Sequence, residues 1–237
     1  MLSRSGSPRR SPQLRSAVVV GLVLLGLTVS AMAQVPVDPD LASYQRVSGV
    51  SGTLTSMGSD TLANLMTLWA EGFRALYPHV PIQIESKGSA AAPPALLAGT
   101  AQLGPMSRAM KPSEREAFAT KYGYLPTAIP VALDAIAIFV HKDNPLTSLT
   151  LAQLDRIFSS THIRGGPPLQ TWGDVGLTGA WALWPLSLYG RNSASGTTGF
   201  FKEHVLRRGD LRTTVKELPG ASSVMHGVAH DLAGIGY

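Results

Sequence analysis

From residue 51 onward, short apolar runs alternate with amphipathic stretches, and this order predicts strands separated by helices. Residues 62–76 carry apolar side chains at every third or fourth position, which is the repeat of a helix with one buried face. That face consists of Leu62, Leu65, Met66, Trp69, Phe73 and Leu76. Alternating apolar residues over 80–86 predict a strand. Residues 128–141 are almost continuously apolar and rich in Val and Ile, which predicts a strand buried on both faces.

Two capping-box patterns, in which Ser or Thr is followed three residues later by Glu or Gln, mark the starts of further helices. They are Ser113 with Glu116 and Thr150 with Gln153. A short helix within 88–100, ended by Gly99, has its prolines in the first turn, where a missing N–H costs little. Another helix is predicted over 197–209, ending at Gly209, and a strand over 186–190, whereas residues 159–186 are predicted as loops. The alternation indicates an α/β fold with mostly parallel sheets flanked by helices.

The first 33 residues form a separate segment. Four arginines precede an apolar run over 17–27, and the sequence AMA at 31–33 has the small residues of a cleavage site. This pattern is typical of a secretory signal peptide over 1–33, and the run is too short for a comfortable membrane anchor. The pair Arg9–Arg10 leaves both general and twin-arginine export open. We therefore predict a periplasmic protein, with a flexible segment over 34–50 that leads into the folded part.

The composition excludes several kinds of binding and catalytic site. The formal charge of +5 comes from 20 basic and 15 acidic residues, and four of the basic residues lie in the predicted leader. The remaining 16 against 15 give +1, so nothing favours nucleic-acid binding. The absence of cysteine excludes disulfides, thiolate metal sites, a cysteine nucleophile and a lipidated N-terminal cysteine.

Three loops share one design, in which small hydroxyl residues and glycine stand between a strand and a helix start. They are MGSDTL at 57–62, KGSAAAPP at 87–94 and GRNSASGTTGF at 190–200. Free N–H groups at helix starts, hydroxyl groups and Arg191 together would form a cradle for a tetrahedral oxyanion. Each loop taken singly is better explained as an ordinary helix cap, and it is the recurrence that favours the cradle.

Enzyme motifs are not found. The loop at 190–200 has five residues between its glycines and no following lysine, so it is not a Walker phosphate loop. No G-x-S-x-G sequence occurs. His226 and His230 stand four residues apart without an acidic partner, so we expect a solvated helix face and no metal site. Trp172, Trp181 and Trp184 are expected to pack within loops rather than to stack on a ligand.

The residues also carry a family resemblance. GSDTL, GSAAAPPALLAGTAQLGPMSR, IPVALDAIAIFVHKDNPLTSLTLAQLDRIFS, GRNSASGTTGFF and GIGY, in this order, resemble the phosphate-binding protein of bacterial phosphate ABC transporters. The similarity runs from about Gly58 to Tyr237. Its most specific part is Arg191 followed by Ser195, Gly196 and Thr197, which looks like the R-x-x-x-S-G-T phosphate loop of that family.

The resemblance implies a two-lobed periplasmic binding protein of type II that closes on phosphate between its lobes. Lobe one would span 51–132 and lobe two 133–237, with a C-terminal return into lobe one missing from this chain. The implied ligand-binding residues are Ser59, Asp60, Thr61, Ser89, Arg108, Arg191, Ser195, Gly196 and Thr197. The implied partner is an inner-membrane ABC transporter permease, and a monomer without metal or cofactor is expected.

Two positions depart from the family pattern. Ser107 is followed by Arg108, where well-characterised members have an aspartate that accepts the proton of hydrogen phosphate. Ser193 stands where members often have an acid that holds the loop arginine. Since Arg108 can only donate hydrogen bonds, selectivity for phosphate over sulfate would need another acceptor, and Asp60 is the candidate. A secreted phosphatase or hydrolase, and a sensor, adhesin or binding protein for another oxyanion such as sulfate, remain as alternatives.

Overall fold

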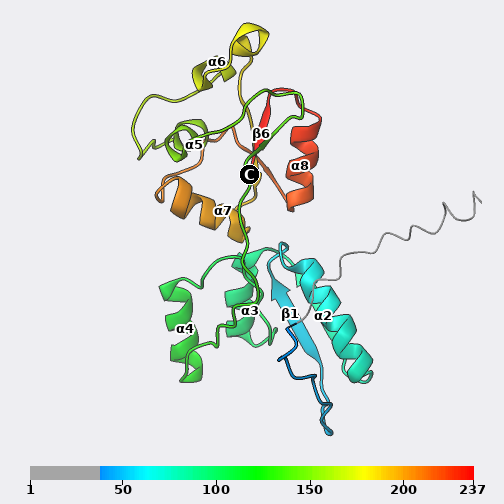
Figure 1. The fold of residues 1–237 in the computed structure, drawn as a ribbon. Coiled ribbons are helices and arrows are strands. Elements are labelled where there is room, and N and C mark those ends of the chain that lie inside the picture. The colour runs from blue at the N-terminus through cyan, green and yellow to red at the C-terminus, as the bar shows by residue number, and fades with distance from the viewer. Residues whose placement is uncertain (1–37) are drawn as a thin grey trace, which may run out of the picture. The chain divides into compact units, whose positions relative to one another are not determined.

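The computed structural model describes residues 38–237, so the predicted signal peptide lies outside the described residues (Figure 1). By its internal contacts the chain divides into residues 1–46 and residues 47–237, and the elements below all belong to the second unit. Residues 38–50 are exposed and contain neither helix nor strand. No helix within residues 38–237 is long and apolar enough to cross a membrane.

A small parallel sheet opens the folded unit. Strand β1 (Leu54–Gly58) pairs in parallel with β2 (Ile82–Ser86), and helix α2 (Ala63–Leu76) connects them. The predicted helix over 62–76 and the strand within 80–86 are thus confirmed. On the predicted apolar face, however, Trp69 remains 46% exposed, so α2 is only partly covered.

A second sheet has the order β3–β6–β4–β5. Its strands are β3 (Phe139–Val140), β4 (Ser187–Arg191), β5 (Lys216–Leu218) and β6 (Gly234–Gly236). Strand β4 pairs in parallel with both β5 and β6, whereas β3 is antiparallel to β6. The predicted fold class, α/β with mostly parallel sheets, is confirmed. Each sheet falls within one predicted lobe, and we keep the names lobe one (51–132) and lobe two (133–237).

Helices and short turns fill the connections between strands. They are η1 (Ser89–Ala91), α3 (Ala92–Ala98), α4 (Pro112–Tyr122), α5 (Leu151–Phe158), α6 (Trp172–Val175), η2 (Gly179–Leu183), α7 (Gly196–Phe200), the π-helical turn η3 (Phe201–Val205) and α8 (Ala221–Ala229). The capping box of α5 is confirmed, since Gln153 N donates to Thr150 Oγ1 and Thr150 N donates to Gln153 Oε1. The segment over 159–186 was predicted as loops, but it holds α6 and η2.

The predicted start of α4 is wrong by two residues, because the residue that caps the helix is Lys111 and not Ser113. The helix begins at Pro112, and the backbone N–H of Lys111 donates to Glu114 Oε2 at 2.8 Å. Proline fits the first position of a helix because its missing N–H would be unpaired there anyway. The helix therefore starts before Ser113, and its end at Gly123, with φ +77°, is as predicted.

The predicted buried strand over 128–141 is also wrong, apart from Phe139 and Val140. Ile129 is 76% exposed and Leu133 is fully exposed. A strand needs a neighbour for its N–H and C=O groups, and no described strand lies beside 129–138. The apolar composition of the segment does not tell whether a neighbouring strand is present. In addition, Pro130 has no N–H to donate to a neighbouring strand.

The helix predicted over 197–209 ends early. Regular structure stops at Val205, and Arg207 and Arg208 then adopt left-handed backbone angles, with φ of 50° and 68°. Gly209 follows the turn instead of ending the helix. The buried side chain of Leu206 and the bond from Arg208 N to Lys202 O hold this turn in place.

The core of lobe two surrounds the sheet from both sides. Trp172, Phe158 and Phe201 are fully buried, and Phe201 stacks on Tyr237 at 3.9 Å between ring centroids. The indole N–H of Trp172 donates to Ala233 O. Trp172 is thus a core residue and not a stacking surface for a ligand.

Candidate anion-binding site

Arg191 is the central charged group of the candidate site. It is the last residue of β4 and only 2% exposed. Its Nη2 donates to Oδ2 of Asp60, which follows β1 in lobe one. Within residues 38–237, Nε of Arg191 has no hydrogen-bond partner. A buried guanidinium N–H without an acceptor is costly, so this donor is suited to an incoming oxyanion.

The loop that follows Arg191 is held by its own hydroxyl groups. Ser195 Oγ accepts from Thr197 N at 3.1 Å, which makes Ser195 the N-cap of α7. Thr198 Oγ1 donates to the carbonyl of Arg191 at 2.8 Å. Tyr237 lies behind this loop, with its hydroxyl 3.5 Å from Thr198 Oγ1, and burial raises the pKa of Tyr237 to about 12. The tyrosine therefore stays neutral and packs as part of the wall behind Arg191.

Lobe one contributes the loop after β1. The backbone N–H of Ser59 donates to Pro105 O at 2.8 Å, while its side chain is buried and Oγ has no partner among the described residues. Thr61 N donates to the other carboxylate oxygen of Asp60 at 3.1 Å. Thr61 itself is exposed. Of this loop, Asp60 contacts lobe two through Arg191, and Ser59 is buried next to it in the chain.

Ser89 and Ser107 form a pair of hydroxyls opposite α7. Ser107 N donates to Ser89 Oγ at 3.0 Å, and the two Oγ atoms lie 3.1 Å apart. A Cβ atom added to Gly196 would lie closer than 3.0 Å to both of these oxygens, a separation that real Cβ atoms essentially never show. Nearby, Ala90 N donates to Ala194 O at 3.1 Å. The loops of the two lobes are therefore in direct contact here.

Arg108 is paired within its own lobe. Its two terminal nitrogens donate to the two carboxylate oxygens of Glu114, at 2.9 and 2.8 Å. Burial would raise the pKa of Glu114, but the hydrogen bonds from Arg108 and from Lys111 N outweigh it and lower the pKa. A lowered pKa means that this contribution to stability is present above the ordinary glutamate pKa and is lost as pH falls through the lowered value. A direct role of Arg108 in binding remains a prediction.

The structure brings four of the nine candidate residues to the contact between the lobes. Asp60 meets Arg191, and Gly196 meets Ser89. Ser107, which sequence analysis did not include, lies among them, and its position just before Arg108 was the available signal. Thr61 and Arg108 are turned to other partners or to solvent. The excess of hydroxyl and N–H donors around one buried guanidinium can bind an anion.

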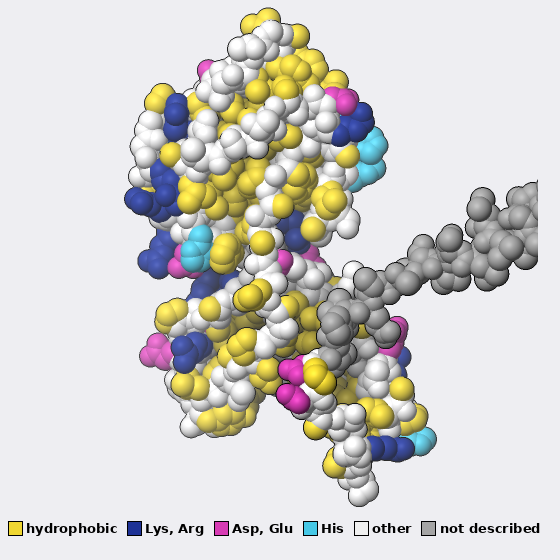
Figure 2. Space-filling view, in the orientation of Figure 1, with side chains coloured by type: hydrophobic (Ala, Val, Ile, Leu, Met, Phe, Trp, Pro, Cys, Tyr) yellow, Lys and Arg dark blue, Asp and Glu magenta, His cyan; other side chains and the backbone are white. Residues whose placement is uncertain are grey.

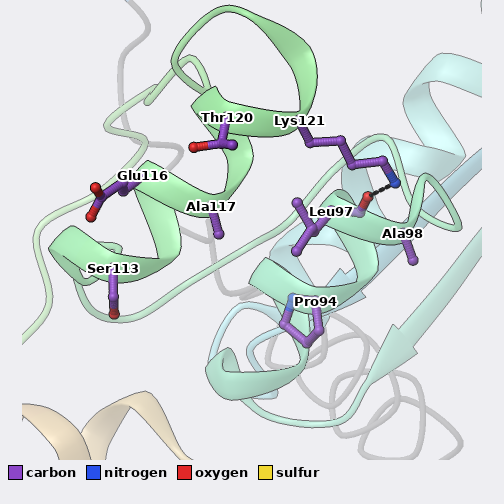
Figure 3. A pocket seen from close by; sticks show the side chains of 8 residues that line it. All are labelled: Pro94, Leu97, Ala98, Ser113, Glu116, Ala117, Thr120 and Lys121. Atoms are coloured by element: carbon purple, nitrogen blue, oxygen red, sulfur yellow. Dashed lines mark hydrogen bonds between the residues drawn. The ribbon is translucent and has the colours of Figure 1, made fainter.

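Other features of the surface are weaker candidates for a binding site than the loops around Arg191. An open hollow between α3 and α4 is lined by small apolar side chains and a few polar ones, and Lys121 Nζ is already bonded to Leu97 O at 2.5 Å (Figure 3). Among residues 38–237, no group of three or more His, Asp or Glu side chains is placed to hold a metal ion. His226 and His230 lie on and just after α8, with ring centroids 4.2 Å apart.

A two-lobed α/β unit with donor-rich loops at the carboxyl ends of its strands is the arrangement of periplasmic-type solute-binding proteins. The chain belongs to the PBP superfamily, whose domain profile matches residues 45–237. It is 59% identical over 209 residues to the phosphate-binding protein PstS of Pseudomonas aeruginosa strain PAO1. That match covers 88% of this chain and 65% of the relative, so the chain spans about two thirds of the length of that protein.

Solved structures show the same fold. A putative phosphate ABC transporter substrate-binding protein from Clostridium perfringens, solved with bound phosphate, matches with a TM-score of 0.65 and 26% identity, over 78% of this chain and 70% of that one. An ABC-type phosphate transport receptor from Vibrio cholerae matches with a TM-score of 0.58 and 23% identity, over the same shares of the two chains.

Proposed function

We propose that this protein binds inorganic phosphate outside the cytoplasm and delivers it to an inner-membrane ABC transporter. The observation that carries the proposal is Arg191, a buried guanidinium at the contact of the two lobes whose Nε has no hydrogen-bond partner within residues 38–237. The similarity to proteins named as phosphate-binding supports phosphate as the ligand.

The proposed binding mode uses donors from both lobes. Lobe two supplies Arg191 with the Ser195–Thr197 loop, and lobe one supplies Ser59 and Ser89. The bound anion and the contact between the two lobes stabilise each other. In the closed arrangement the anion is surrounded by more hydrogen-bond donors than either lobe alone could provide. No metal or cofactor is needed, since guanidinium and N–H dipoles neutralise the charge.

Calorimetric titration of the purified protein with phosphate, sulfate and molybdate tests the function. Phosphate is expected to bind with a Kd of about a micromolar or tighter, which corresponds to roughly 8 kcal/mol or more. An absence of heat with all three anions would contradict the proposal. Release of p-nitrophenol from its phosphate ester would instead support the hydrolase alternative.

Asp60 is proposed to accept the proton of hydrogen phosphate while it also orients Arg191. A carboxylate repels sulfate, which has no proton to donate at neutral pH. Asp60→Asn is expected to reduce the ratio of phosphate to sulfate affinity by roughly 10- to 100-fold, the range for one hydrogen bond to a charged group. Titration of both anions into wild type and variant measures this ratio.

Glu217→Gln is the matched control, because Glu217 Oε2 accepts from Ser193 N at 3.1 Å beside the same loop. The Glu217→Gln substitution removes one negative charge but does not remove a partner of Arg191. The ratio of phosphate to sulfate affinity should therefore hardly change. An unchanged ratio of phosphate to sulfate affinity in Asp60→Asn would show that Asp60 does not accept the proton of hydrogen phosphate.

A further inference from the structure

Two histidines stand together at the end of α8. His226 lies in the last turn of the helix and His230 is its C-cap residue. Residues four positions apart lie on the same face of a helix. The centroids of the two imidazole rings are 4.2 Å apart, with 45° between the ring planes. Both residues are exposed, and histidine side chains, drawn in cyan, are seen at the surface of lobe two beside α8 (Figure 2).

A hydrogen bond fixes the tautomer of the neutral His230 ring. Its Nδ1 lies 2.9 Å from the carbonyl oxygen of His226. A carbonyl oxygen can only accept a hydrogen bond, so Nδ1 carries the proton and donates it. In the neutral ring Nε2 then has a free lone pair, which is the form of histidine that binds metal ions. Histidines that bind metals almost always donate their other ring N–H to a backbone carbonyl, a carboxylate or water, and His230 already has this partner.

The helix that presents the pair is packed firmly on the sheet of lobe two. Val224 and Val228, on the opposite side of α8, are buried against Tyr189. Gly236 of β6 approaches the same two valines so closely that an added Cβ would lie 3.0 Å from each. Because α8 has little freedom to shift, the two imidazoles are held near each other before any ion binds, which favours binding.

The charged groups next to the pair in the chain and across the sheet are already paired with each other. Asp231 follows His230; its Oδ2 accepts from Tyr189 OH at 2.8 Å and lies 3.5 Å from Lys216 Nζ. Its Oδ1 accepts from Ala233 N at 3.0 Å. The carboxylate therefore balances the charge of Lys216 and is not free to act as a third ligand. Since both histidines are exposed, water can complete the coordination of an ion that they hold.

We propose that His226 and His230 bind a divalent transition-metal ion, with Cu²⁺ preferred, through one nitrogen of each ring. Two histidines four residues apart on one helix face are the spacing by which zinc metalloproteases supply two of their metal ligands. Imidazole suits zinc, nickel and copper, and the affinity of a given site for divalent ions of this series is highest for Cu²⁺. The sequence predicted no metal site at this pair because no acidic partner stands with it, whereas Cu²⁺ accepts imidazole nitrogens together with water oxygens.

Titration of Cu²⁺ into the full chain, purified without a polyhistidine tag and followed by electron paramagnetic resonance, tests the proposal. The wild type is expected to bind copper through two nitrogen ligands. His226→Gln and His230→Gln are each expected to bind Cu²⁺ about tenfold more weakly or worse, since loss of an outer partner of a ligand already costs roughly 10–100-fold in affinity. His226→Gln keeps the hydrogen bond from His230 Nδ1, because the acceptor is a backbone carbonyl. Weaker binding by this variant therefore cannot come from a lost helix cap.

His79→Gln is the matched control, because it removes one exposed imidazole that follows α2 in lobe one. It should bind Cu²⁺ as the wild type does. The proposal is overturned if His79→Gln loses as much affinity as the variants of the pair, or if either of these binds copper as tightly as the wild type. A spectrum of the wild type with a single nitrogen ligand would also overturn it. Phosphate affinity should be the same in His226→Gln and the wild type, so this proposal stands or falls apart from the proposed function.

Discussion

Replacing Arg191 with lysine is expected to weaken phosphate binding by at least about a hundredfold. Lysine keeps the charge but loses the planar fork and the Nε donor, which has no hydrogen-bond partner within the described residues. Truncating one partner of a buried charged contact typically costs about 2–5 kcal/mol, and a hundredfold loss lies within that range. Isothermal titration of phosphate into wild type and variant measures the change.

Arg212→Lys separates a loss of binding from a loss of stability. Arg212 donates to the carbonyls of Ser159, Leu169 and Arg156 within lobe two, and burial lowers its pKa. This variant is expected to lower the melting temperature while phosphate affinity stays near the wild-type value. A folded Arg191→Lys protein that binds phosphate normally would show that the arginine is only structural.

The second large effect is expected from Gly196→Ala. The added methyl group would collide with the hydroxyl oxygens of Ser89 and Ser107 in the opposite lobe. Either the lobes stay apart or the two serines move, and in both cases the donors no longer surround one anion. We expect phosphate affinity to fall roughly 30- to 100-fold, equivalent to about 2–3 kcal/mol of clash and lost contacts. Titration calorimetry measures the affinity, and small-angle scattering with saturating phosphate shows whether the lobes still close.

Gly199→Ala is the matched control three residues further along the helix. Its added methyl group would lie 3.3 Å from Cδ of Arg108, whose side chain is held at its end by Glu114 but has to move by only a few tenths of an ångström. Binding should change by less than about threefold, since a small adjustment relieves the contact. Equal effects of the two substitutions would mean that helix propensity, and not the approach of Gly196 to Ser89 and Ser107, explains the loss.

Elements with strong local signals could be predicted from the sequence. The repeat over 62–76 and the capping box of Thr150 with Gln153 involve residues within one or two helical turns, so neighbouring side chains determine them. The loop after Arg191 was likewise recognisable, because its hydroxyl and glycine residues are contiguous. These parts of the fold and of the candidate site depend little on distant contacts.

The errors arose where distant contacts decide the structure. Residues 128–138 have the composition of a strand, but a strand also requires a neighbour, which composition does not specify. At Val205 the helix stops because buried Leu206 and the bond from Arg208 N to Lys202 O hold the next turn. No local rule predicts two left-handed arginines there. The pairing of Asp60 with Arg191 joins residues 131 positions apart, so the sequence alone could only propose them separately.

Ser107 and Arg108 show the same limit within the site. Sequence analysis included Arg108 because it stands where members of the phosphate-binding family have an aspartate, whereas the structure pairs it with Glu114 and places Ser107 beside Ser89. Glu114 stands six residues after Arg108, and the path of the chain between them is not predictable from the sequence.

The most direct measurement is a crystal structure with arsenate, an analogue of phosphate whose arsenic atom is located by anomalous scattering. The arsenate oxygens are predicted to lie about 2.7–3.2 Å from Arg191 Nε and from hydroxyl or N–H donors of both lobes, including those of the Ser89 loop. An arsenic position bound by one lobe alone, or away from Arg191, would contradict the claim that distant loops meet around a single anion.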